Sequence, residues 1–168
     1  MSPWHMPRLG AMDSRSGALP LSGLPPTSGH AGIWRFSVPP VEHAVPHVRH
    51  AVRDLLRRQQ APLTADRLYG VLLILSELVT NSARHAALLT TEIGVEVGFD
   101  AYWVRLSVED GHPYRPRALD VAPDQHHTSG RGLLLVKATA LEAGGDCGVT
   151  ATATGGKVVW AALPVDRV

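Results

Sequence analysis

The sequence predicts an α/β domain, a two-layer α+β sandwich in which helices pack on one face of an antiparallel or mixed sheet. Two long segments carry apolar residues at helical spacing, and two segments in which apolar and polar residues alternate follow them. A long irregular stretch, a third helical segment and the composition of a β-hairpin complete the chain. Because some strands follow each other directly and others follow helices, this order favours the two-layer class.

Length and composition limit the kind of protein. With 168 residues, 45% of them hydrophobic, the chain can bury one sizeable core. We expect one ordered domain over residues 31–168, after a disordered tail over residues 1–30 that is rich in Pro, Gly and Ser. A net charge of +1 argues against direct nucleic-acid binding, and no stretch is apolar enough to span a membrane. The single cysteine, Cys147, suits a cytoplasmic protein.

The ordered part begins with a strand and a helix. Residues 33–38 have the composition of a strand, which ends at two prolines. Residues 41–60 then carry valines and leucines at helical spacing, and Pro46 falls in the first turns of this helix, where proline is tolerated. After a break, Thr64 is placed to cap a second helix.

The second helix is long and apolar and carries two polar residues of interest. Its buried stripe consists of Leu68, Val71, Leu72, Leu75, Leu78 and Val79. Glu77 and Asn81 lie beside this stripe, and because they are four residues apart they share one face of the helix. A carboxylate can accept a proton or orient a hydroxyl group, and an amide oxygen can bind Mg2+. The alternative is a polar stripe on a solvated helix.

The next two segments predict adjacent strands, and the second ends in a carboxylate. Apolar residues occupy the odd positions of 93–99 and the even positions of 104–108. The even phase reaches Asp110, which would then point toward the core. A buried carboxylate is costly unless a donor binds it, and the exocyclic amine of adenine would be such a donor. The alternative is that the strand has already ended and Asp110 opens an Asp-Gly turn.

A long irregular connection, residues 111–129, leads to a glycine-rich helix start. A connection of this length inside a compact domain is usually functional or disordered. It ends at Gly130-Arg131-Gly132, where glycines allow close approach of the backbone and the first-turn N–H groups can face an anion. Arg131 could add a charge-assisted contact to phosphate. The helix would end at Gly144-Gly145, before strands over 149–154 and 157–164.

These stretches together resemble the GHKL ATPase superfamily, and in detail its anti-sigma-factor serine/threonine kinase branch, which is common in actinobacteria. Residues 77–86, ELVTNSARHA, resemble the N box. Asp110-Gly111 resembles the G1 box, residues 130–136 the G2 box, and residues 156–160 the closing strand. The resemblance covers residues 32–164 in the expected order, and it implies the Bergerat-type ATP-binding fold.

The resemblance also implies cofactors and roles for individual residues. ATP and Mg2+ would be bound, with Asn81 coordinating the Mg2+ that bridges the phosphates. Glu77 would act as the base or orient the hydroxyl that attacks the γ-phosphate. Asp110 would bind the adenine amine. The other residues that would contact the nucleotide, beneath a lid formed by the loop before the third helix, are Arg84, Gly111, Gly130, Arg131, Gly132 and Leu133.

Two hypotheses for the function follow. Members of the family that the chain resembles transfer the γ-phosphate of ATP to a serine of an anti-sigma-factor antagonist, and they bind a sigma factor when that antagonist is phosphorylated. The resemblance therefore implies a protein kinase with these two partners, in a family whose members commonly form homodimers. The second hypothesis is a partner-binding module that uses ATP only as a conformational ligand or not at all. Its motivation is the G1 box, whose fuller form is Asp-x-Gly-x-Gly, whereas His112 and Pro113 follow Gly111 here.

Overall fold

The computed structural model describes residues 32–113 and 131–166, so that the tail predicted over 1–30, most of the predicted lid and Gly130 lie outside the described residues. Nine elements follow each other along the chain: β1 (Gly32–Val38), η1 (Glu42–Ala44), α1 (Val45–Arg58), α2 (Ala65–Ala86), β2 (Ile93–Phe99), β3 (Trp103–Asp110), α3 (Arg131–Glu142), β4 (Asp146–Ala151) and β5 (Lys157–Pro164). Among these residues, no helix combines the length and the apolarity needed to cross a bilayer.

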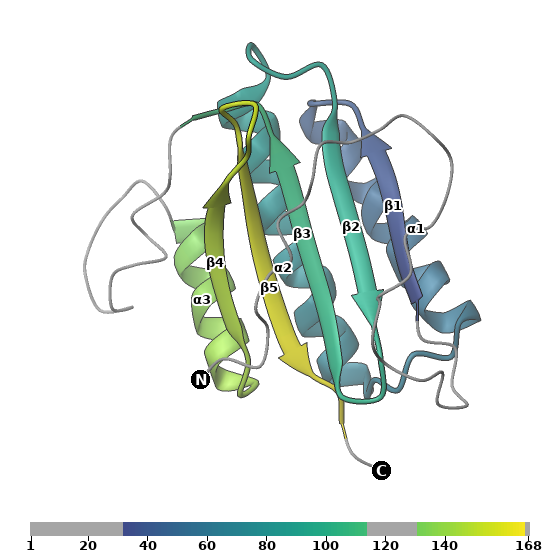
Figure 1. The fold of residues 1–168 in the computed structure, drawn as a ribbon. Coiled ribbons are helices and arrows are strands. Elements are labelled where there is room, and N and C mark those ends of the chain that lie inside the picture. The colour runs from purple at the N-terminus through teal and green to yellow at the C-terminus, as the bar shows by residue number, and fades with distance from the viewer. Residues whose placement is uncertain (1–31, 114–130, 167–168) are drawn as a thin grey trace.

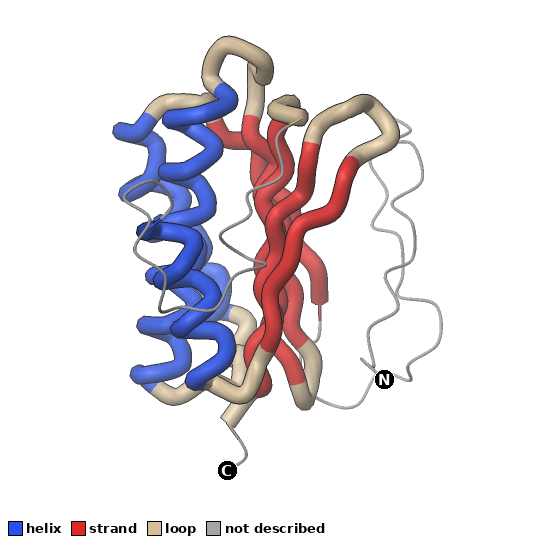
Figure 2. Tube along the Cα trace, turned by 90° about the vertical axis from the view of Figure 1, so that its left-hand side faces the viewer, coloured by secondary structure: helices blue, strands red, loops and turns tan. Residues whose placement is uncertain are grey.

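The five strands form one sheet in the order β1-β2-β3-β5-β4, and every neighbouring pair is antiparallel. All three α-helices cover the same face of this sheet, as the edge-on view in Figure 2 shows, and α2 lies behind the central strands in Figure 1. The α/β class with helices on one face, predicted from the sequence, is therefore confirmed. The antiparallel alternative is the correct one for the sheet.

The alternation of the central strands places their apolar side chains against the helices. In β2 the odd-numbered residues are buried, and in β3 the even-numbered residues are buried throughout, including Asp110. The strand register sets Val108 opposite Val159 and Asp110 opposite Lys157. The predicted inward direction of Asp110 is confirmed, because the strand continues through this residue instead of ending before it.

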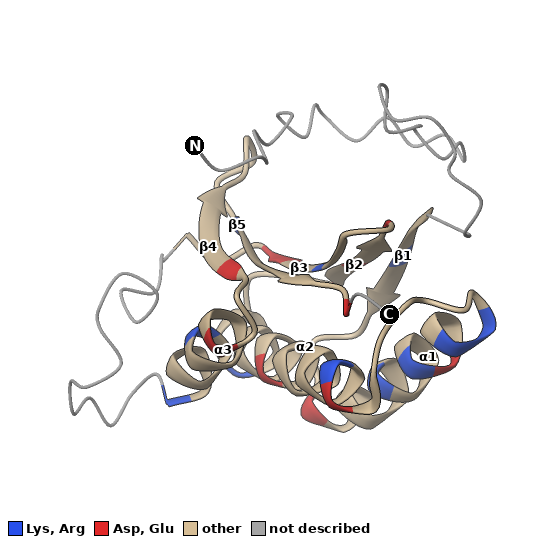
Figure 3. Cartoon of the chain, turned by 90° about the horizontal axis from the view of Figure 1, so that it is seen from below, with Lys and Arg blue, Asp and Glu red and all other residues tan. Residues whose placement is uncertain are grey.

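Helix α1 is shorter than its predicted range of 41–60. A 3-10 turn occupies residues 42–44, and Pro46 stands in the first turn of the α-helix, where its missing N–H is not needed. The helix ends at Arg58 because Gln60 adopts a positive φ of 52°. Its inner face packs Val48, Val52 and Leu56 into the core, and Figure 3 shows basic residues along the length of this helix.

Strand β4 begins and ends three residues earlier than predicted. The preceding helix closes at Gly144, whose φ of 77° reverses the chain, so the strand can start at Asp146. The hairpin turn then begins at Thr152, whose hydroxyl accepts a 2.8 Å hydrogen bond from the Gly156 N–H. Gly155, at a φ of 88°, completes this turn. Two glycine-dependent reversals, one on each side, thus determine where the strand lies.

The predicted N-cap of α2 also attaches the end of the described chain to the helix. The Thr64 hydroxyl oxygen accepts a 3.2 Å hydrogen bond from the Arg67 N–H. The same hydroxyl donates to Asp166 Oδ2 at 2.6 Å, and the Thr64 N–H donates to that oxygen at 3.0 Å. These bonds, that of the hydroxyl first, lower the pKa of Asp166.

We predict that Thr64→Ala lowers the free energy of unfolding by about 1 kcal/mol, because the cap and one bond to Asp166 are lost. Urea unfolding followed by circular dichroism measures this change. A carboxylate whose pKa is lowered in the folded protein stabilises the fold fully at pH values above its ordinary pKa of 3.8. This contribution is lost as the pH falls through the lowered pKa. The difference between wild type and variant should therefore shrink in acid. Thr91→Ala, at an exposed threonine before β2, is the control and should change little.

Candidate functional site

Helix α2 carries the two polar residues that the sequence singled out, and both are half-buried. The helix is held between the sheet and its neighbouring helices by a fully buried stripe that includes Leu75, Leu78 and Val79. Glu77 and Asn81 flank this stripe at the edge of the core, as the helical spacing predicts. Their side chains are thus positioned by a rigid element, and neither is on a free surface.

The start of α3 lies directly against Glu77. A Cβ atom built at Gly132 would collide with Glu77 Oε2, so the carboxylate occupies the space that a side chain at residue 132 would need. Within residues 32–113 and 131–166, no group forms a hydrogen bond or ion pair with this carboxylate. The first-turn N–H groups of α3 have no acceptor within the helix itself, which makes this end attractive to anions. An available carboxylate therefore stands beside an anion-favouring helix end.

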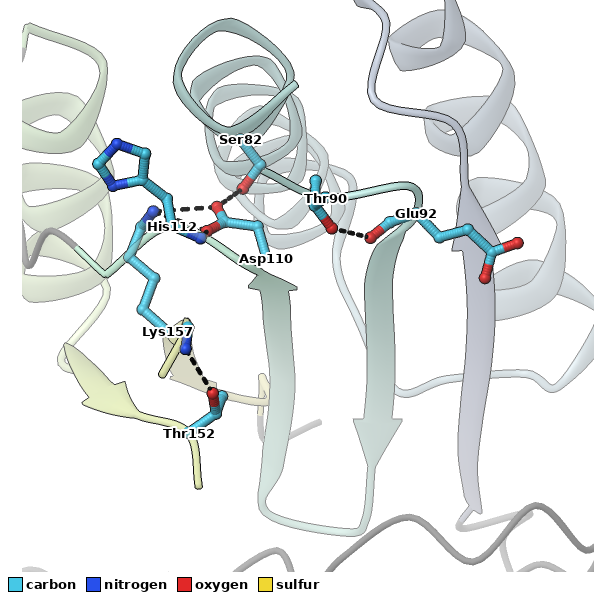
Figure 4. A network of polar contacts seen from close by, with 8 residues as sticks. Ser82, Thr90, Glu92, Asp110, His112, Thr152 and Lys157 are labelled. Atoms are coloured by element: carbon cyan, nitrogen blue, oxygen red, sulfur yellow. Dashed lines mark hydrogen bonds and ion pairs between the residues drawn. The ribbon is translucent and has the colours of Figure 1, made fainter. Parts of the chain in front are cut away.

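A second contact joins α2 to the ends of two strands. The Ser82 hydroxyl donates a 2.6 Å hydrogen bond to Asp110 Oδ2. Lys157 Nζ donates to both oxygens of Asp110, at 2.8 and 3.0 Å, and the His112 N–H donates to Oδ1 at 2.9 Å. Figure 4 shows these groups converging from α2, β3 and β5. The donors that a buried carboxylate needs come here from the chain itself, so its burial alone does not require a ligand.

Close backbone approach makes this second contact possible. A Cβ atom at Gly156 would collide with the carbonyl oxygen of Asp110, and one at Gly111 would lie 2.5 Å from the carbonyl oxygen of Leu89. Glycine is therefore needed beside each member of the ion pair. With these glycines, the last residue of β3 and the first of β5 face each other, and the Asp110 and Lys157 side chains are 1% and 3% exposed.

The remaining predicted site residues are distributed unevenly. Arg131 and Gly132 lie at the start of α3 as predicted. The Leu133 side chain is buried in the core, so only the backbone of this residue could contact a ligand at the helix end. Arg84 is exposed and forms a 2.6 Å ion pair from its Nε to Glu42 Oε1. The hydrogen bond and charge of Glu42, and to a lesser degree the charge of Glu77, raise the pKa of Arg84.

Two residues of the site were missed by the sequence reasoning. Ser82 continues the buried stripe of α2, three residues after Val79, and this spacing was its signal. Lys157 shares the strand phase of Val159 and Ala161, which indicates the core side of β5. A lysine at an inward position requires a buried acid as partner, and Asp110 is that acid.

The residues brought together can orient a hydroxyl group and hold a phosphate-bound cation. No group of three or more His, Cys, Asp or Glu side chains in the described parts of the chain is arranged to hold a metal ion. A cation at Asn81 would therefore take most of its ligands from phosphate oxygens and water, which suits Mg2+. Two shallow hollows on the described surface, one between β1 and α1 and one at the β2–β3 turn, contain none of the predicted site residues.

Comparison with known proteins identifies the family of the sequence. The model of the histidine kinase-like ATPase domain matches residues 38–162. A chain of the SiaB-SiaC complex from Pseudomonas aeruginosa is similar in structure, with a TM-score of 0.51, 13% identity, and coverage of 82% of this chain and 92% of that one. The histidine kinase domain of the blue-light activated histidine kinase from Erythrobacter litoralis EL346 has a TM-score of 0.45 and 18% identity, over 74% of this chain and 60% of that one. No curated protein matches the sequence significantly.

We predict that Lys157→Met lowers the free energy of unfolding by about 3 kcal/mol, because it leaves the Asp110 charge buried without its partner. The double variant Asp110→Leu/Lys157→Met should regain most of this loss, since no unpaired charge remains. Chemical denaturation of wild type, both single variants and the double variant measures the coupling. Lys137→Met, at the other lysine of the chain, is the control. Additive effects of the two single substitutions would contradict a mutual dependence.

Proposed function

Because the chain belongs to the histidine kinase-like ATPase domain family, we propose that it binds ATP with Mg2+ on the face of α2 that carries Glu77 and Asn81. The observation that carries this proposal is the contact between Glu77 and Gly132. This contact supports the proposal, because an available carboxylate then lies beside the helix end that would face the phosphates. Phosphoryl transfer depends mostly on positioning and charge stabilisation, so a few fixed groups suffice.

In this proposal the main predicted residues have separate tasks. Asn81 would bind the Mg2+ that bridges the phosphates, and the first-turn backbone of α3, with Gly130 and Arg131, would contact their oxygens. Glu77 would accept the proton of the attacking hydroxyl or orient that hydroxyl. Asp110 would lie at the base end of the nucleotide. The Mg2+ would neutralise charge on the phosphates, and the chain itself would supply the position of the nucleophile.

We further propose that the phosphate acceptor is a serine of an anti-sigma-factor antagonist and that a sigma factor is the second partner. The resemblance of residues 77–86 and 130–136 to the N and G2 boxes supports this branch of the family. The similar SiaB-SiaC structure is a complex of two proteins, which makes a protein partner the natural first search, and homodimerisation belongs to the same proposal. The other candidate, a partner-binding module without transfer, is favoured by His112 and Pro113 at the irregular G1 box.

We predict that Asn81→Ala weakens binding of Mg2+-ATP by about tenfold, because one ligand of the cation is lost. Calorimetric titration measures the dissociation constant with Mg2+ and again with a chelator. Binding of ATP without Mg2+ should change much less. The control is His85→Ala, an exposed residue one turn further along α2. Equal weakening with and without Mg2+ would contradict the proposed role of Asn81.

We predict that Glu77→Gln reduces phosphotransfer by about 100-fold or more while the affinity for ATP stays nearly unchanged, because only the basicity of the side chain is removed. Incubation with γ-labelled ATP and candidate antagonist proteins measures the transfer. Calorimetry measures the affinity on the same samples. A wild-type protein that binds ATP but labels no antagonist would favour the partner-binding module. Full transfer by Glu77→Gln would contradict the proposed role of Glu77 as the base.

A further inference from the structure

The acceptor capacity of Asp110 is fully used by the chain itself. A carboxylate offers about four lone-pair positions, two on each oxygen. Oδ1 accepts from the His112 N–H at 2.9 Å and from Lys157 Nζ at 2.8 Å. Oδ2 accepts from the Ser82 hydroxyl at 2.6 Å and from Lys157 Nζ at 3.0 Å. A further donor can bind this carboxylate only in place of one already there.

The donor that matters most is Lys157, since it supplies two of the four contacts and the only positive charge among them. Hydrogen bonds from an ammonium group are stronger than those from a neutral amine. Lys157 is 2% exposed as a residue, so that moving its ammonium away from Asp110 would leave a charge without a partner inside the protein. A neutral amine that displaces it gains little, because it exchanges a strong bond for a weaker one.

The position of Lys157 is set by the fold and is not a chance rotamer of a surface side chain. Asp110 and Lys157 are directly opposite in the β3–β5 ladder, and Gly156 brings the two backbones together beside them. The pair faces α2, one residue away from Asn81 in sequence through Ser82. The competing ammonium therefore lies beside the same helix that carries the proposed Mg2+ ligand.

We propose that Lys157 sets the base specificity of the nucleotide site, by occupying on Asp110 the acceptor positions that an adenine amine would use. This inference rests on the proposed function, because it concerns the base end of the same nucleotide. The amine of adenine then adds little to the affinity of the wild-type protein. A purine nucleotide without the amine binds about as well as ATP, and the phosphates and Mg2+ supply most of the affinity.

Calorimetric titration with two nucleotides tests this inference. ATP and purine riboside triphosphate, which differ only in the amine, are titrated with Mg2+ into wild type, Lys157→Met, Lys157→Arg and Lys137→Met. In wild type the two dissociation constants should agree within about threefold. In Lys157→Met, which frees the carboxylate, ATP should bind about tenfold more tightly than the analogue. Lys157→Arg keeps a cationic donor and Lys137→Met leaves the pair intact, so both should resemble wild type.

The possible outcomes distinguish a failure of the inference about Lys157 from a failure of the proposed ATP binding. Wild type that prefers ATP by tenfold or more would overturn the inference even if Lys157→Met fails to fold. An unchanged ratio in folded Lys157→Met would overturn it as well. Agreement of the two constants in wild type with a preference for ATP only in Lys157→Met would support it. If no variant binds either nucleotide, the proposed function fails and the inference fails with it, whereas failure of the ratio alone leaves ATP binding in place.

Discussion

The buried ion pair between Asp110 and Lys157 joins two central strands, and through Ser82 it also contacts the helical layer. Both charges have left water, and such a pair is tolerable only if its geometry is good and its remaining hydrogen-bonding groups are satisfied. The 2.6 Å bond from Ser82 and the 2.9 Å bond from the His112 N–H meet this condition for the carboxylate. Because the donors come from α2, from the residues just after β3 and from β5, the pair is satisfied only when both layers and the strand register are in place. The ion pair therefore stabilises this arrangement of the elements relative to similar arrangements in which its hydrogen bonds would be lost.

Helix α2 contributes a contact that stabilises this arrangement, and it also bears the residues proposed for phosphoryl transfer. Ser82 contacts the strand ends, and Glu77 contacts the start of α3, five residues or roughly 7.5 Å earlier along the helix axis. Asn81 lies between these two contacts. The bond from Ser82 to Asp110 and the buried stripe of α2 hold the helix against the sheet. The sandwich thus holds the groups at both ends of the site in a fixed relation, which positioning chemistry requires.

Features of the fold and site that depend on neighbouring residues could be predicted from the sequence, whereas features that depend on residues far apart in the chain could not. The alternation that turns Asp110 inward and the cap at Thr64 are local patterns, and both were predicted. The pairing of Asp110 with Lys157 spans 47 residues, and it depends on which strand lies beside β3. The ion pair from Arg84 to Glu42 spans 42 residues and joins two different helical elements. The early start of β4 depends on a positive φ at Gly144, which composition alone does not place.

The contacts of Gly156 and Gly132 differ in what a side chain there would disturb. Beside the ion pair, Gly156 meets backbone atoms of Asp110, which cannot move without breaking the β3–β5 ladder. Gly132 instead meets the end of the Glu77 side chain, which can rotate away at small energetic cost. Crowding at Gly156 thus acts on folding, while crowding at Gly132 acts on where one carboxylate points. The ion-pair end of the site is constrained by stability, and the Glu77 end is constrained mainly by the position that the proposed chemistry requires of that carboxylate.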